Sequence, residues 1–90
     1  QYMKEKEIER CLKALANIRR LSIVRYVKKE NESNVSDIAN EIKLSFAATS
    51  RHLNLLASAD ILDREQRGLE MFYYISQSLP EPARRIISIL

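Results

Sequence analysis

The stretch Leu44–Leu56 most constrains what this chain can fold into. Within it, Thr49, Leu53 and Leu56 recur at the spacing of one helix face, which would turn toward a core. At about 100° per residue, the opposite face carries short side chains and one arginine, namely Ala47, Ser50, Arg51 and Asn54. The stretch therefore predicts an amphipathic helix over residues 46–58, with Ser45 as its N-cap.

The small polar face of this helix allows two interpretations. A solvated surface is the simpler one, but solvated faces usually carry long Glu and Lys side chains. Short side chains instead let a helix backbone approach a partner closely, and an arginine can form paired hydrogen bonds with guanine or phosphate. We therefore expect helix 46–58 to enter the major groove of DNA.

A period of two residues follows on both sides of Gly68, the only glycine of the chain. Side-chain character alternates from residue 61 to the glycine and again after it, and β-branched and aromatic residues gather in the second segment. This pattern predicts a β-hairpin over residues 62–75. Because an isolated hairpin is only marginally stable in water, it must lie against the helices.

Two helices are predicted before this region, over residues 5–16 and 18–27, from apolar residues at helical spacing. Asn17 is the expected break between them. Residues 28–34 are expected to form a polar connection.

Two further helix starts follow from capping chemistry. Ser36 is expected to cap a third helix, with Asp37 at the positive end of its dipole, and Pro82 suits the first turn of the last helix. The fold class is therefore mainly α with a small β-hairpin, in the order of four helices, two strands and a helix. We expect one domain over residues 1–90, with residues 1–4 frayed.

The composition limits the classes of protein to which the chain could belong. Its 90 residues suffice for one small domain, and 46% hydrophobic with 30% charged residues is typical of a globular protein. A net charge of +3 favours an anionic partner. No apolar run approaches the roughly 18 residues of a membrane span, so we expect no membrane partner and a cytoplasmic location.

Enzyme chemistry is not indicated. No Ser/His/Asp arrangement is visible, and one glycine cannot build a phosphate-binding loop. The single cysteine, Cys11, excludes an intrachain disulfide and is expected to be a small buried side chain, although a bond between two subunits stays open. We expect neither an enzyme nor a bound cofactor.

Four segments, in their order and spacing, are similar to those of one known family. They are Leu15–Val24, Val35–Ala39, Leu44-Ser45 with Ser50–Leu53, and Arg67–Tyr74. On these segments the chain resembles the ArsR/SmtB family of bacterial and archaeal transcriptional repressors. The resemblance implies a winged helix-turn-helix fold and a homodimer paired through the first and last helices. It also implies a pseudo-palindromic DNA operator and repression released by an inducer, whose identity is unknown.

The chain departs from this family at its metal sites. Many members bind metal through Cys-x-Cys at the start of the third helix, where this chain has Asn34 and Ser36. Another family site uses histidine and acidic residues on the last helix, which here has no histidine. A tetrahedral zinc site needs about four donors, mainly Cys and His, and this chain has one of each. We therefore expect no metal site.

A second departure is Phe46, where family members often have a polar residue. With Ala47 and Ala48 it lowers the expected number of hydrogen bonds to bases, and apolar contact with thymine methyl groups could replace some of them. The expected contacts with double-stranded DNA combine base edges, phosphates next to the helices and phosphates gripped by the hairpin. These residues are Ser36, Lys43, Ser45, Phe46, Ala47, Ser50, Arg51, His52, Asn54, Arg64 and Arg67.

The helices over 5–16 and 82–90 carry more apolar residues than a thin core must hide, which favours a symmetric homodimer. The expected interface residues are Ile8, Leu12, Leu15, Ala83, Ile86, Ile87 and Leu90. The sequence thus predicts a homodimeric DNA-binding repressor. The alternative is a winged-helix module that binds another protein, because a fold does not dictate its partner.

Overall fold

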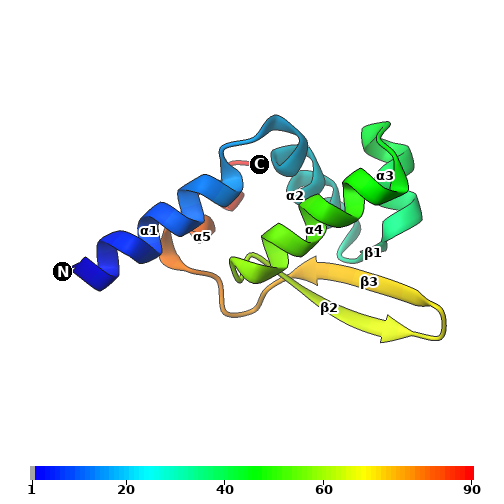
Figure 1. The fold of residues 1–90 in the computed structure, drawn as a ribbon. Coiled ribbons are helices and arrows are strands. Elements are labelled where there is room, and N and C mark those ends of the chain that lie inside the picture. Colours follow the sequence, from blue (N-terminus) through cyan, green and yellow to red (C-terminus); the bar gives the residue numbers. More distant parts are fainter. Residues whose placement is uncertain (1) are drawn as a thin grey trace.

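The computed structural model describes residues 2–90, with side chains from residue 4 onward. Figure 1 shows the helices bundled together, with the two long strands forming a hairpin along the lower edge of the molecule. The described elements are α1 (Tyr2–Leu15), α2 (Ile18–Glu30), β1 (Ser33–Asn34), α3 (Val35–Ile42), α4 (Phe46–Ser58), β2 (Leu62–Arg67), β3 (Glu70–Ile75) and α5 (Glu81–Ser88). The predicted order of four helices, a hairpin and a final helix is confirmed, with one short strand added.

The sheet is antiparallel, with β3 between β1 and β2. The hairpin pairs Leu62 with Ile75 at its base and Arg67 with Glu70 next to the turn, where Gly68 has a left-handed φ of 60°. Strand β1 pairs Ser33 with Tyr73. The prediction of a polar connection over 28–34 was wrong at both ends of that segment. Helix α2 continues to Glu30, and residues 33–34 form strand β1. A strand of two residues is too short to show a periodicity in the sequence.

The start of α3 also differs from the prediction. Ser36 is not the N-cap: the side chain of Asn34 accepts a hydrogen bond of 2.8 Å from the backbone N–H of Asp37, and the helix begins at Val35. Asparagine caps as well as serine does, and starting the helix earlier buries the Val35 side chain. The Asn34 amide also donates to Glu70 on β3 over 2.9 Å, so the cap is tied to the sheet.

The predicted Ser45 cap agrees with the structure, and Asn17, expected as the break between the first two helices, also acts as a cap. Asn17 caps α2 by accepting from the N–H of Arg20, and Ser45 caps α4 by accepting from the N–H of Ala48 over 3.1 Å. Pro82 lies in the first turn of α5 as expected, after Pro80 at the N-cap position.

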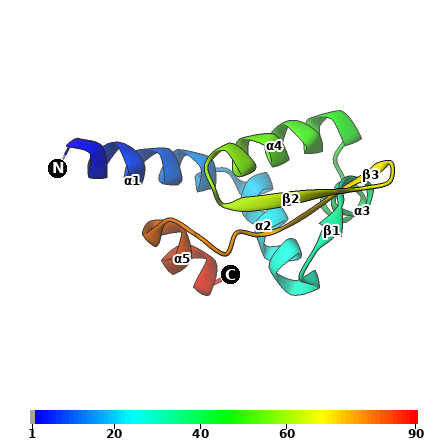
Figure 2. The same ribbon diagram turned by 90° about the horizontal axis from the view of Figure 1, so that it is seen from below.

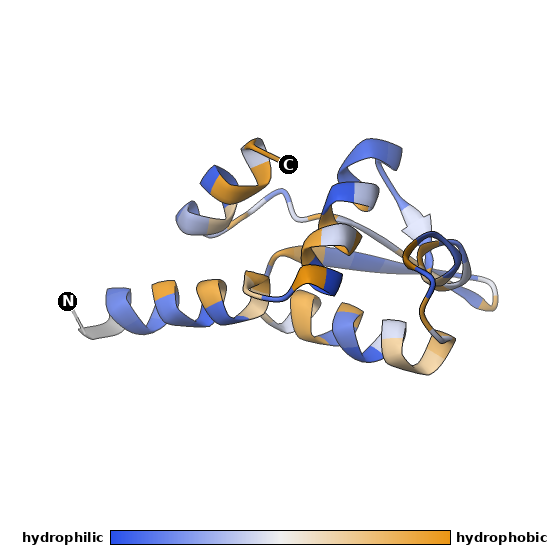
Figure 3. Ribbon diagram, turned by 90° about the horizontal axis from the view of Figure 1, so that it is seen from above, coloured by the Kyte–Doolittle hydropathy of each residue, from blue (hydrophilic) through white to orange (hydrophobic). Residues whose placement is uncertain are grey.

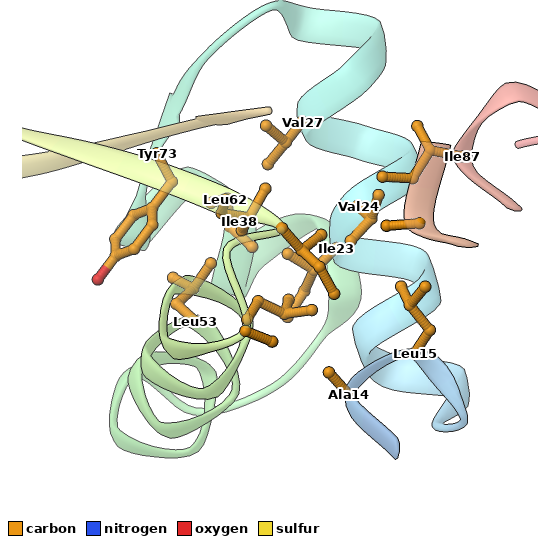
Figure 4. Packing of buried hydrophobic residues seen from close by; sticks show 14 of the residues in the cluster. Ala14, Leu15, Ile23, Val24, Val27, Ile38, Leu53, Leu62, Tyr73 and Ile87 are labelled. Carbon is orange, nitrogen blue, oxygen red and sulfur yellow. The ribbon is translucent and has the colours of Figure 1, made fainter. Parts of the chain in front are cut away.

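The core forms where α2, α3, α4 and the base of the hairpin meet, as Figure 4 shows. Ile23, Val24, Ile38 and Leu53 are fully buried there. The inward face predicted for α4 is confirmed, because its three positions Thr49, Leu53 and Leu56 are all 0% exposed. This burial leaves the opposite face of α4 toward solvent.

Helices α1 and α5 lie next to each other at the end of the molecule away from the hairpin, and α1 extends beyond the body (Figures 1 and 2). The Nζ of Lys28 on α2 donates to the carbonyl of Ile87 over 2.9 Å and so ties the end of α5 to α2. Arg10 on α1 donates to the carbonyl of Ser58 at the end of α4 and lies 3.2 Å from the Asp60 carboxylate.

Three of the residues expected at a dimer interface belong to the core of the single chain instead. Leu15, Ala83 and Ile87 are 3%, 0% and 5% exposed, because α5 packs onto α1 and α2 within one chain. An apolar stripe on a helix indicates burial but does not say against what. The stripe residues that stay accessible are Ile8, Leu12, Ile86 and Leu90.

We expect Leu53→Ala to lower the free energy of unfolding by about 2–5 kcal/mol, because it opens a cavity in a fully buried site. Urea unfolding followed by circular dichroism measures this change. Leu69→Ala removes the same atoms from a fully exposed position at the hairpin tip and serves as the matched control. Equal loss of stability in the two variants would contradict the assignment of α4 to the core.

Candidate nucleic-acid interface

A tight turn between α3 and α4 sets the angle of α4. Lys43 ends α3 with a left-handed φ of 57°, and the N–H of Leu44 donates to the carbonyl of Ala39 over 3.0 Å. Ser45 then caps α4 directly. Two helices joined in this way are the arrangement of a helix-turn-helix.

The exposed face of α4 carries the residues expected from the sequence. Ala47, Arg51 and Asn54 are exposed, and Ser50 is half-buried. Phe46 is 58% exposed although it is a large aromatic residue. The structure thus brings the four predicted side chains to one side of α4, and Phe46 is accessible at the start of the same helix.

A groove of about 360 Å³ runs between α4, the start of α3 and the hairpin. Arg64 on β2 spans it by donating to the Asn54 side chain over 2.9 Å. The groove lining comprises Asn34, Val35, Ser36, Phe46, Ser50, Asn54, Arg64, Gln66, Leu69, Glu70, Met71 and Tyr73. Ser36, placed in the first turn of α3 and not at its cap, therefore lies at the same surface as α4.

Gln66, Leu69 and Met71 were not among the residues predicted for this surface. Leu69 had a recognisable signal, because it follows Gly68 in the predicted turn and connecting segments lie at the surface; it is fully exposed here. Gln66 and Met71 also had a signal, because residues two apart on a strand share a face, which places Gln66 beside Arg64 and its cross-strand partner Met71 with them.

Arg67 lies at the hairpin tip, but its charge is already paired. Its guanidinium donates to both carboxylate oxygens of Glu32 over 2.7 and 2.8 Å and to Glu65 over 2.8 Å, and lies 4.5 Å from the centre of the Phe72 ring. The hydrogen bonds with Glu32, and to a smaller extent with Glu65, raise the pKa of Arg67. The hydrogen bonds with Arg67 lower the pKa of Glu32. Of the two arginines expected to grip phosphates, Arg64 is therefore the one not held by carboxylates.

His52 is half-buried between α4 and α2, on the flank of the exposed face. Its Nδ1 lies 3.2 Å from the guanidinium of Arg20, which also donates to the carbonyls of Ala14 and Lys13 at the end of α1. This contact gives His52 a role in helix packing, on the flank of the face expected to contact DNA. Burial lowers the pKa of His52, and the charges of Arg20, Arg19 and Arg51 lower it further.

The lowered pKa of His52 predicts a loss of stability in mild acid. Between the folded pKa and the unfolded value of about 6.5, the unfolded chain binds more protons, so the free energy of unfolding falls as the pH drops through this window. Protonation also ends the hydrogen bond that Nδ1 accepts from Arg20. Urea unfolding at pH 7.5 and pH 5.5 measures the change, and His52→Gln should have a smaller one. An equal drop in both proteins would assign the acid sensitivity to other groups.

Cys11 is 1% exposed, and burial raises the pKa of its thiol, which keeps it protonated and unreactive. This agrees with the expected role as a small buried side chain. Among the described residues, no three His, Cys, Asp or Glu side chains gather where they could hold a metal ion. In residues 2–90 no helix has the combined length and apolar character needed to cross a bilayer.

The fold and this surface define a winged helix-turn-helix protein, with α3 and α4 as the helix-turn-helix and the hairpin β2–β3 as the wing. The chain belongs to the arsR family of bacterial regulatory proteins, whose family model matches residues 17–64, more than half of the chain. The resemblance seen in the sequence is thereby confirmed.

Two relatives agree with this assignment. CadC, a cadmium resistance transcriptional regulatory protein of Listeria innocua serovar 6a, is 41% identical over 63 residues, which are 70% of this chain and 53% of CadC. The chain thus spans about half the length of that relative. The transcriptional repressor PagR of Bacillus anthracis is 30% identical over 88 residues, which are 98% of this chain and 88% of PagR.

Solved structures show the same fold over almost the whole chain. The crystal structure of PagR has a TM-score of 0.81 at 31% identity, covering 99% of this chain and 98% of PagR. Reduced HlyU from Vibrio cholerae has a TM-score of 0.84 at 27% identity, covering 99% of this chain and 90% of HlyU. The homodimeric winged helix-turn-helix DNA-binding domain Mb0332 from Mycobacterium bovis has a TM-score of 0.79 at 27% identity, covering 93% of this chain and 74% of Mb0332.

Proposed function

We propose that this chain is a homodimeric repressor that binds a pseudo-palindromic DNA operator in the bacterial cytoplasm. In this proposal α4 enters the major groove, and the wing lies along the flanking backbone. The observation that carries it is the exposed face of α4, which holds short side chains and Arg51 directly beside a groove shared with the wing. PagR, similar over almost the entire chain, is described as a transcriptional repressor.

The proposed contacts divide by their position on this surface. Ser50, Arg51 and Asn54 face base edges from the middle of α4, together with Phe46 and Ala47 from its first turn. Backbone phosphates are contacted by groups at the helix starts, on the α3–α4 turn, on the helix flank and on the wing. These are Ser36, Lys43, Ser45, His52, Arg64 and Arg67.

The function is tested by selecting bound fragments from random duplexes with the purified protein. Enrichment of a palindromic site, bound more weakly as salt rises, supports the proposal because counterions are released from phosphates. Half-sites about one helical turn apart, roughly 34 Å, are expected for a two-fold symmetric dimer. The alternative protein-interaction module predicts that no duplex is enriched.

We expect Arg51→Ala to weaken operator binding by about 10- to 100-fold, because it removes a charged donor from the base-facing side of α4. Gel mobility shift with the selected duplex measures the loss. Arg25→Ala, which removes the same charge from an exposed position on α2, is the control and should bind almost as well as the unaltered protein. Equal affinities for both variants would remove Arg51 from the interface.

The dimer part of the proposal rests on apolar side chains that α1 and α5 leave uncovered. Leu12 on α1 is 47% exposed and Ile89 after α5 is 82% exposed, while Ile8, Ile86 and Leu90 are half-buried beside them. A second copy that covers both helices would bury these side chains, each worth roughly 1.5–3 kcal/mol when fully buried. The homodimeric state of Mb0332 supports this choice of partner.

We expect Leu12→Glu to give monomers, because it places a charge in the proposed interface without disturbing the core. Sedimentation velocity measures the mass, and operator affinity should fall at least about tenfold once the two half-sites are no longer bound as one unit. Leu69→Glu adds the same charge at the exposed wing tip and should remain a dimer. A Leu12→Glu protein that still sediments as a full dimer would show that the interface lies elsewhere.

A further inference from the structure

We propose that Phe46, with Ala47 beside it, reads the 5-methyl group of thymine in each half-site. The protein would then require a thymine at the base pair that faces the first turn of α4. This inference rests on the proposed function, since it needs α4 in the major groove. It adds a specificity-determining residue and the chemical group that this residue recognises.

Phe46 is largely exposed and lies outside the core. It is the first residue of α4, directly after the Ser45 cap, and 58% of it is accessible. It does not belong to the described residues that form the core or pack against it. Figure 3 shows the resulting apolar first turn of α4 at the end of the helix nearest the wing tip.

The position of Phe46 determines what it can touch. The first turn of a recognition helix is the part that reaches base edges in helix-turn-helix complexes. Ser45 before it is the N-cap, whose hydroxyl oxygen accepts the N–H of Ala48. The ring itself offers no hydrogen-bond donor for a base edge or a phosphate.

The thymine methyl group is the largest apolar feature of a base pair in the major groove. Guanine, cytosine and adenine present donors or acceptors there, and thymine adds the C5-methyl group beside its O4 acceptor. A phenylalanine against any other base edge would desolvate polar atoms without replacing their hydrogen bonds, which is unfavourable. Thymine is therefore the base that fits Phe46.

The hydrogen-bonding capacity of α4 is also limited in its middle part. The Asn54 side-chain oxygen accepts from Arg64 over 2.9 Å, and Ser50 is half-buried. Arg51 remains the long exposed donor on this face. With few polar readers, an apolar contact at the first turn carries a larger share of the sequence preference.

The test uses the duplex obtained from random selection and replaces single thymines with deoxyuridine, which lacks only the 5-methyl group. Replacing the contacted thymine in one half-site should lower the affinity by about fourfold, the factor expected when one buried methyl group is lost. With both half-sites substituted, the loss should be about 15-fold. Thymines outside the half-sites serve as controls and should tolerate the replacement.

A double-mutant cycle assigns the contact to Phe46. Phe46→Ala should bind the thymine duplex more weakly and should no longer distinguish it from the deoxyuridine duplex. Leu69→Ala, another exposed apolar residue facing the same groove, should keep the full discrimination. Circular dichroism of Phe46→Ala checks that the variant is folded, as expected for an exposed position.

The outcomes distinguish a failure of this inference from a failure of the proposed function. Failure to enrich any duplex overturns the proposed function. If the duplex binds equally well whichever single thymine is replaced, the proposed function stands and the thymine inference is overturned. Discrimination that survives in folded Phe46→Ala overturns the role of Phe46.

Discussion

Burial of one face of α4 is the constraint on which the rest of this molecule depends. Thr49, Leu53 and Leu56 are fully buried, so the helix cannot rotate about its axis without exposing them. Burying a large apolar side chain is worth roughly 1.5–3 kcal/mol, whereas an exposed ion pair is worth about 0–1 kcal/mol. The core therefore sets the orientation of α4, and the outward direction of Ala47 and Arg51 follows from helix geometry.

The wing is positioned by a different set of interactions. Its middle is fixed by backbone pairing of β3 with β1 as well as with β2, and Asn34 joins the cap of α3 to Glu70 next to the turn. Its tip is held by the exposed pairing of Arg67 with Glu32, which salt weakens. Phosphate would have to displace two carboxylates to reach Arg67, so Arg64, which bridges to Asn54, is the better placed cation for DNA.

Two arginines connect the proposed dimer end of the molecule to the proposed DNA end. Arg10 joins α1 to the end of α4, and Arg20 joins the last carbonyls of α1 to His52 on α4. Helix α1 and helix α4 thus belong to one connected unit. In a symmetric dimer, the distance between the two α4 helices would follow directly from how α1 and α5 pair with their copies.

Much of this structure can be predicted from short-range patterns. The buried and exposed faces of α4, the Ser45 cap, the hairpin around Gly68 and the family all follow from residues a few positions apart, because periodicity and capping act locally. The candidate surface on α4 was predicted for the same reason. What local patterns cannot supply is the partner of each face. Ser33 pairs with Tyr73, Arg67 with Glu32, and Ile87 packs into the core of its own chain, so these outcomes depend on residues distant in sequence that meet only after folding.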